Sequence, residues 1–174
     1  MRPRLYEFLA AAATAIVLRV PAVTAKPEQI RAVQEPIFHF YLQAYPGDPT
    51  IPVMGPEASS EYFEIGSPTP GTIQSTNSSA YLNIVEDTAS YKTLVFAAEG
   101  EGDGEGEGRT DAWALEGDTI ITSTASAYGR QLNFLACRLE GAADFWQVYL
   151  QMGSDIPADR TCSNFQSLHL PCLC

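Results

Sequence analysis

Four cysteines are the residues whose type and spacing bear most directly on chemistry. Cys137, Cys162, Cys172 and Cys174 are an even set. In an oxidising compartment such a set predicts two disulfides, and four cysteines allow three pairings. We favour Cys137–Cys162, which leaves Cys172 and Cys174 to close a very tight ring. Separate pairing of Cys137 and Cys162 with the tail is the competing arrangement, and zinc is disfavoured because paired C-x2-C knuckles are missing.

The two histidines do not predict a catalytic or metal site. His39 and His169 each lie in an alternating pattern typical of a strand, where they face solvent or a sheet surface. The chain has no G-x-S-x-G, P-loop or H-E-x-x-H motif. A glycosidase needs only two carboxylates at the right separation, but no pair is distinguished by its surroundings. We therefore expect no enzyme activity and no cofactor.

Residues 99–108 form an acidic, glycine-rich run, EGEGDGEGEG. Carboxylates can bind calcium, but the run matches neither an EF-hand loop nor a glycine-aspartate repeat. Glycine raises the entropy cost of ordering and the carboxylates repel one another. The run predicts a disordered loop tip.

Aromatic side chains beside carboxylates and amides can bind sugars. Trp113 and Trp146 fall in predicted strands, where packing in the core is the commoner role. Tyr128 lies in a Ser/Gly-rich turn and is the better candidate for an exposed aromatic. Asn77 begins the one N-glycosylation acceptor, Asn-Ser-Ser, in another turn-like segment, which we expect to be exposed.

The N-terminal segment, residues 1–25, has the features of a signal peptide. Arg2 and Arg4 precede the apolar run 8–18, and the small-residue pattern 23–25 ends at a cleavage site. The apolar run is shorter than the roughly 20 residues that span a bilayer. Residues 26–36 are polar and are predicted as a leader arm, which places the β-rich domain at 37–174.

Charge and the C-terminal residues exclude several partners. The net charge is −11, and cleavage after residue 25 would make the protein more acidic. Nucleic acids and anionic lipids bind through clusters of Lys and Arg, and the chain has no such cluster. The C-terminal residues also lack the long apolar tail of a lipid-anchor signal. These features predict a secreted protein without a membrane anchor.

Short strands separated by Gly, Ser, Asn or Asp predict the fold. The candidates are residues 37–44, 51–54, 62–65, 72–75, 80–85, 92–97, 112–116, 119–123, 131–137, 145–151 and 165–170. β-Branched and aromatic residues are enriched in them, and no window after residue 35 has sustained helical periodicity. The pattern predicts a compact all-β domain, either a barrel or a sandwich.

An internal echo favours a barrel of the β-trefoil type. The order of strands from residue 62 to 96 recurs about fifty residues later, from 113 to 150. A repeated four-strand unit suits a β-trefoil, with the two chain ends supplying the third unit. A β-sandwich is the alternative, because hairpins in any β protein can produce a similar echo.

The C-terminal half resembles the fungal cell-wall proteins of PhiA type. The resemblance is carried by residues 113–118, 132–137 and 146–150 with Gly153, Cys162 and Phe165. It is clear over roughly the last third of the chain and looser over 72–97. The acidic-glycine run and the Cys-Leu-Cys end depart from that pattern.

The resemblance implies a secreted, wall-associated and non-enzymatic protein. We therefore expect a structural or interaction role in a fungal cell wall or at the cell surface, with wall polysaccharide or a wall protein as partner. A carbohydrate-binding module is the first alternative, and a secreted effector or hydrolase is the second. Fold class alone does not decide among them.

Overall fold

A computed structural model describes residues 26–98 and 110–171. Strands and the turns between them make up this part of the chain, apart from one short 3-10 helix, η1 (Glu57–Ser59). The strands are β1 (Arg31–Ala32), β2 (Tyr41–Tyr45), β3 (Asp48–Gly55), β4 (Phe63–Ile65), β5 (Ile73–Ser75), β6 (Tyr81–Val85), β7 (Tyr91–Ala97), β8 (Trp113–Glu116), β9 (Thr119–Thr122), β10 (Phe134–Leu139), β11 (Ala142–Gln151), β12 (Cys162–Gln166) and β13 (Leu168–His169). The predicted all-β class is confirmed. No helix in the described residues is long and apolar enough to cross a membrane.

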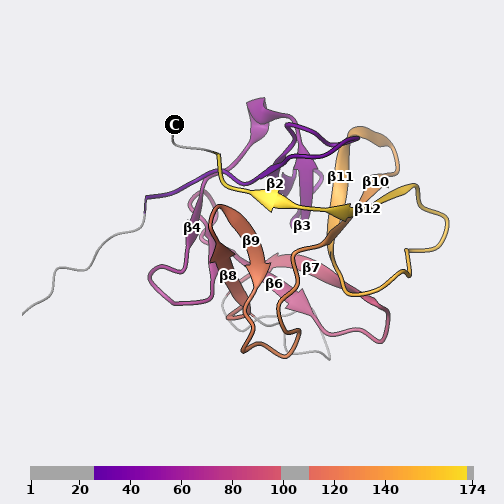
Figure 1. Cartoon of the computed structure of the whole chain (residues 1–174). Helices are drawn as coiled ribbons and strands as arrows, with labels where there is room; N and C mark the ends of the chain where they lie inside the picture. The colour runs from indigo at the N-terminus through magenta and orange to yellow at the C-terminus, as the bar shows by residue number, and fades with distance from the viewer. Residues whose placement is uncertain (1–25, 99–109, 172–174) are drawn as a thin grey trace, which may run out of the picture.

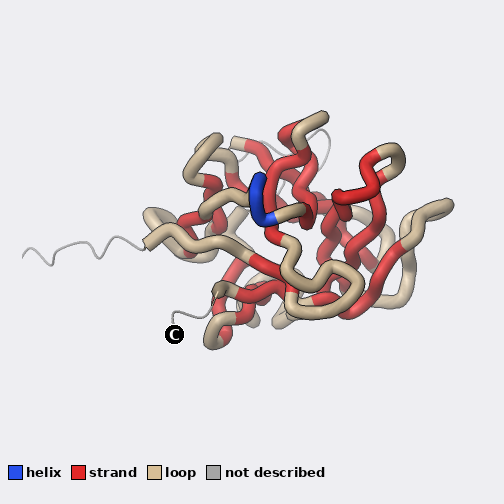
Figure 2. The backbone as a smooth tube through the Cα atoms, turned by 90° about the horizontal axis from the view of Figure 1, so that it is seen from above, coloured by secondary structure: helices blue, strands red, loops and turns tan. Residues whose placement is uncertain are grey.

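The strands form one antiparallel sheet that curls toward closure (Figures 1 and 2). Its order is β4-β5-β6-β7-β11-β3-β2-β1-β13-β9-β8, and β10 lies between β11 and β12 outside this path. Closing a twisted sheet removes the exposed edges that favour aggregation. The result is a compact, barrel-like domain, as the sequence predicts.

The segment 26–36 belongs to this sheet, so the prediction of a leader arm is wrong. Glu28 and Phe63 of β4 exchange two backbone hydrogen bonds, of 2.9 and 2.8 Å. The Leu42 N–H of β2 donates to the Ile30 carbonyl at 2.8 Å, so the segment joins two strands far apart in the sheet order. Ile30 and Ala32 are fully buried. Two buried apolar residues in a mostly polar segment are too few to produce a recognisable strand pattern.

The strand predicted over 37–44 begins later, at Tyr41. Its first half is a reversal, in which the Phe40 N–H donates to the Ile37 carbonyl at 2.9 Å. His39 has a φ of 62°, which a strand does not accommodate. Ile37 is buried while Phe38 is exposed, so the apolar alternation here reflects a turn and not a strand.

The internal echo corresponds to two pairs of hairpins. β4–β5 and β6–β7 are antiparallel hairpins in the first unit, and β8–β9 and β10–β11 are their counterparts in the second. The units differ in how their hairpins join, because β5 pairs with β6 whereas β9 pairs with β13. The repeat therefore predicts the hairpins correctly and their assembly only in part.

The main core fills the interior of the curled sheet, and Trp113 helps to close it. The Trp113 backbone N–H donates to the Gly71 carbonyl at 2.8 Å, and its indole N–H donates to the Leu82 carbonyl of β6 at 2.7 Å. Its ring stacks near Phe134 of β10, with centroids 6.3 Å apart. One side chain thus links β8, β6 and β10, three strands that do not pair with one another in the described sheet.

Candidate ligand-binding site

The disulfide between Cys137 and Cys162 is present, as the sequence favoured. The two residues lie directly opposite each other on β10 and β12, with an S–S distance of 2.06 Å. Cys137 is fully buried, so the bond is a structural link and not a reactive pair. Cys172 and Cys174 lie outside the described residues, and their pairing stays a prediction.

A second, smaller apolar cluster surrounds this disulfide. Leu135, Cys137 and Tyr149 pack together, and the Tyr91 ring meets the Tyr149 ring edge-on with centroids 5.4 Å apart. Burial raises the pKa of the Tyr149 phenol, because desolvation disfavours the phenolate. The cluster holds β12 against β10 and β11, and so fixes the strand that carries Phe165.

An open cavity of about 500 Å³ lies at the turn between β10 and β11. Arg138 and Arg160 line it together with the carboxylates of Glu140 and Asp159. The Arg138 guanidinium lies 5.8 Å from the Trp146 ring centroid, and Arg160 donates to Gln147 at 2.8 Å. Because the two cationic and two anionic side chains balance, the cavity does not select for one sign of charge.

The two histidines lie in different surroundings. His39 is exposed in its turn and stacks against Phe38, with ring centroids 4.0 Å apart. His169 is part of a polar cluster that sequence reasoning missed: Nδ1 lies 3.3 Å from Asp118 Oδ1, and Nε2 lies 3.2 Å from Ser167 Oγ. The hydrogen bond from His169 lowers the pKa of the Asp118 carboxyl.

Asp118, His169 and Ser167 are the residue types of a hydrolase triad, in the order Asp, His, Ser. The backbone N–H of Ser167, however, is already hydrogen-bonded. Acyl transfer needs free N–H donors near the nucleophile to stabilise the oxyanion. The Ser167 N–H instead donates to Gln34 Oε1 at 3.0 Å. These hydrogen bonds connect the residue before β9, the start of β13 and the segment between β1 and β2.

Asn77 lies in the turn between β5 and β6 and is exposed, as expected of a glycosylation acceptor. Its backbone N–H donates to the Ser75 hydroxyl at 3.2 Å, and its side-chain amide makes no hydrogen bond to another described residue. The acidic run at 99–108 lies outside the described residues.

The burial of the aromatic residues agrees with the expectation for the two tryptophans and differs from it for Tyr128. Trp113 and Trp146 are buried, in agreement with a core role. Tyr128 is also buried and donates to Glu86 at 2.6 Å, so its assignment as an exposed aromatic is wrong. The turn that carries it folds back onto the sheet. The exposed aromatics are Phe165 (62% exposed), Tyr62 (50%) and Phe38 (49%).

Phe165 lines a pocket. The pocket has a volume of about 270 Å³ and lies between the end of β11, β12 and the segment before β10. All of its lining residues are uncharged: Gln131, Asn133, Gln151, Met152, Gly153, Ser154 and Phe165. An exposed ring, a thioether and three amides therefore surround one small pocket.

A buried glutamine holds Phe165 in an unusual conformation. Phe165 has a φ of 58°, the left-handed region that non-glycine residues rarely occupy. The Gln151 side-chain oxygen accepts the Phe165 N–H at 2.7 Å. The Gln151 amide nitrogen donates to Asn164 Oδ1 at 3.3 Å and to the Gly153 carbonyl at 3.0 Å. Gln151, at the end of β11, thus connects the segment after β11 to β12, the two segments on this side of the pocket.

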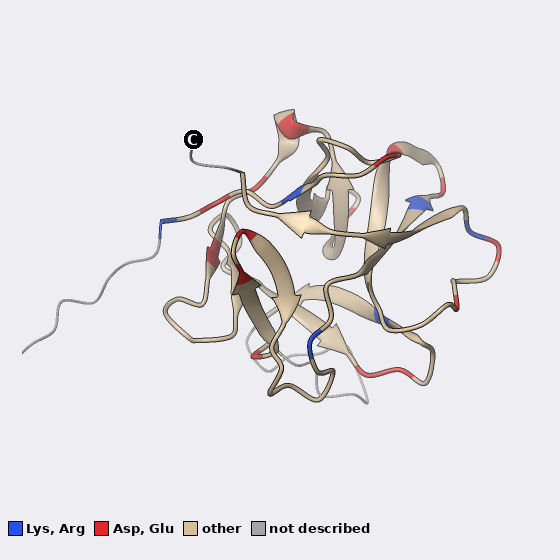
Figure 3. Ribbon diagram, viewed as in Figure 1, with Lys and Arg blue, Asp and Glu red and all other residues tan. Residues whose placement is uncertain are grey.

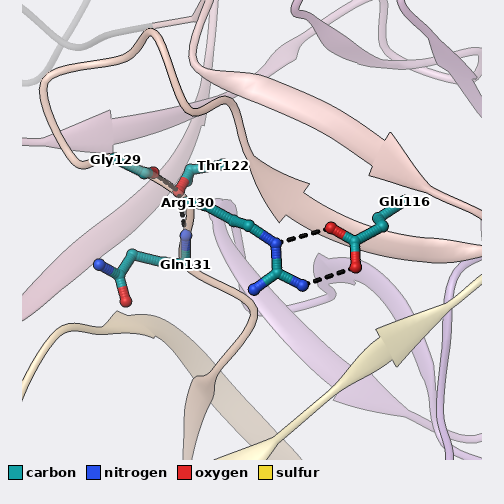
Figure 4. Close-up of polar contacts among 5 residues, drawn as sticks. All are labelled: Glu116, Thr122, Gly129, Arg130 and Gln131. Atoms are coloured by element: carbon teal, nitrogen blue, oxygen red, sulfur yellow. Dashed lines mark hydrogen bonds and ion pairs between the residues drawn. The ribbon is translucent and has the colours of Figure 1, made fainter.

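The opposite wall depends on a loop fixed by Thr122 and Arg130 (Figure 4). The buried Thr122 hydroxyl donates to the Gly129 carbonyl at 2.6 Å and accepts the Gln131 N–H at 2.9 Å. Arg130 makes two hydrogen bonds of 2.6 Å to Glu116, which lower the pKa of that carboxyl. The Gln131 and Arg130 side chains extend in opposite directions, so Gln131 can line the pocket while Arg130 secures the loop (Figure 4).

The uncharged lining of the pocket contrasts with the acidic character of the whole protein. Acidic residues are spread along the described chain, with few basic residues between them (Figure 3). Within residues 26–98 and 110–171, no group of three or more His, Cys, Asp or Glu side chains could hold a metal ion.

No family model, no curated protein and no solved structure matches this chain.

Proposed function

We propose that this is a secreted, non-enzymatic protein of a fungal cell wall or cell surface, with a structural or interaction role. The observation that carries the proposal is the buried Cys137–Cys162 bond, which joins neighbouring strands and suits an oxidising compartment. The signal-like residues 1–25 and the exposed Asn77 acceptor agree with export. The resemblance to PhiA-type proteins supplies the location in the wall.

Fractionation of a fungal host that expresses the full chain tests this proposal. We expect the protein in the cell-wall fraction, released by hot detergent or wall-degrading enzymes and not by lipase. Deletion of residues 2–25 is the matched control and should leave the protein inside the cell. Recovery of the full chain only in the cell interior would contradict export, and recovery only in the medium would contradict wall association.

Binding of carbohydrate is the second candidate function, and the pocket beside Phe165 favours it. A wall protein must hold another component of the wall, so this function would be one form of the first. The pocket offers an exposed aromatic ring beside amide groups, the combination of apolar and polar contacts found in small-molecule sites.

A further inference from the structure

We infer that the pocket beside Phe165 is a binding site for one unit of an uncharged saccharide chain. This inference rests on the proposed extracellular role and names the ligand class for it. The three arguments are the uncharged lining, the amide and hydroxyl groups left unpaired, and the strained conformation in which the aromatic ring is held.

The lining of the pocket excludes a preference for charged ligands. None of its seven residues carries a formal charge, in a protein with a net charge of −11. A phosphate, sulfate or carboxylate ligand would need Lys or Arg, and a cationic ligand would need nearby carboxylates. A neutral ligand needs neither, which agrees with this lining.

The pocket also holds polar groups that make no bond within the described protein. The Asn133 side-chain amide and the Ser154 hydroxyl have no partner among the described residues, and Gln131 uses only its amide nitrogen, which donates to the Tyr128 carbonyl at 3.1 Å. Amides and hydroxyls offer both donors and acceptors. Sugar hydroxyl groups also both donate and accept, so these groups match a saccharide.

The Phe165 ring supplies the apolar half of such a site. A sugar ring has an apolar face of C–H groups, which packs on an aromatic ring, and Met152 adds further apolar surface. The exposed ring gains nothing from core packing, yet the left-handed backbone that presents it costs free energy. The buried Gln151 holds this strained conformation, and residues in such conformations cluster at functional sites.

The size of the pocket limits how much of a ligand it can hold. At about 270 Å³ it falls just below the roughly 300–1,000 Å³ of sites that enclose a drug-sized molecule. One monosaccharide unit suits this volume. A site for a single unit binds weakly by itself, and a saccharide chain offers the same unit many times, which raises its apparent affinity.

Titration of the purified mature protein, residues 26–174, with neutral hexasaccharides tests the inference. The probes are chitohexaose, laminarihexaose and cellohexaose, with a proline-rich peptide as a non-saccharide comparison, measured by calorimetry and by NMR. We expect one saccharide to bind and Phe165→Ala to weaken that binding at least tenfold. Phe38→Ala, a matched change of an exposed aromatic outside the pocket, should leave it unchanged. Melting temperatures verify that each variant is folded.

The outcomes separate this inference from the proposed function. Absence of saccharide binding, binding of the proline-rich peptide alone, or equal binding by Phe165→Ala and the unchanged protein would each overturn the saccharide site. Retention in the wall fraction would still support the wall role in each of these cases. Saccharide binding lost with Phe165→Ala, combined with absence from the wall fraction, would support the site and contradict the wall location.

Discussion

Trp113 and Phe165 show two opposite uses of an aromatic side chain in one small domain. Trp113 is 2% exposed, has both its N–H groups hydrogen-bonded and links three strands of the core. Phe165 is 62% exposed, lies in a left-handed backbone conformation and shares its pocket with the unpaired Asn133 amide. The polar N–H groups of Trp113 are therefore all paired, whereas the pocket beside Phe165 combines a strained backbone with polar groups that have no partner.

The difference separates residues that stabilise the fold from residues available for binding. Burial of a large ring with its polar atoms paired adds to the free energy of unfolding. An exposed ring on a strained backbone lowers it, and such positions cluster at functional sites. We therefore expect changes at Trp113 to act on stability, and changes at Phe165 to act on binding.

The largest expected effect is that of Trp113→Ala. Removing a buried tryptophan leaves a cavity and an unpaired Leu82 carbonyl, so we expect the free energy of unfolding to fall by about 3–5 kcal/mol. Denaturant unfolding followed by circular dichroism measures the change. Any saccharide binding should persist in the fraction that stays folded. A loss below about 1 kcal/mol would contradict the role of Trp113 in closing the sheet.

Cys137→Ser is the next largest, and it should affect both regions. Loss of a native disulfide typically costs about 2–5 kcal/mol, and here it also frees the start of the strand that carries Phe165. We expect secretion to fall sharply and the melting temperature to drop. Normal secretion with an unchanged melting temperature would show that the bond does not stabilise the domain.

The sequence predicts the strands well because their signals are local. Alternating apolar residues bounded by turn residues identify hairpins such as β6–β7 and β10–β11 without knowledge of their partners. The pairing of Glu28 with Phe63 is a contact between distant residues, which a local pattern does not encode. The segment 26–36 is therefore predicted as a leader arm although it pairs with the sheet.

The pocket beside Phe165 has no signal in the sequence, for a related reason. Phe165 has no local signal for a positive φ, since glycine and asparagine are the residues that favour it. Its conformation depends on Gln151, which is fourteen residues away in the sequence. Tyr128 had the local features of an exposed turn and is buried by contacts that the sequence does not reveal.

Gln151→Ala should have an intermediate effect that sharpens the comparison. It removes three hydrogen bonds that hold the pocket, so we expect a loss of about 1–3 kcal/mol in stability together with weaker saccharide binding. Gln74→Ala is a matched control, because the Gln74 side chain makes one exposed hydrogen bond, to the Ser79 carbonyl at 3.0 Å. That control should change stability by less than about 0.5 kcal/mol. Similar losses for both variants would argue against Gln151 as the residue that orders the pocket.

The smallest expected effect is the difference in stability between glycine and alanine at position 165. It is the most diagnostic, because glycine should be the more stable of the two there, the reverse of the usual order. In an ordinary strand glycine is less stable than alanine by roughly 0.5–1 kcal/mol. At Phe165 the left-handed φ of 58° penalises alanine and not glycine, so we expect Phe165→Gly to be more stable than Phe165→Ala by about 1 kcal/mol. The same pair of changes at Phe38, which has no positive φ, should show the usual order. Denaturant unfolding of the four variants measures both differences. If glycine is the less stable choice at both positions, then Phe165 carries no backbone strain, and the contrast with Trp113 reduces to a difference in burial.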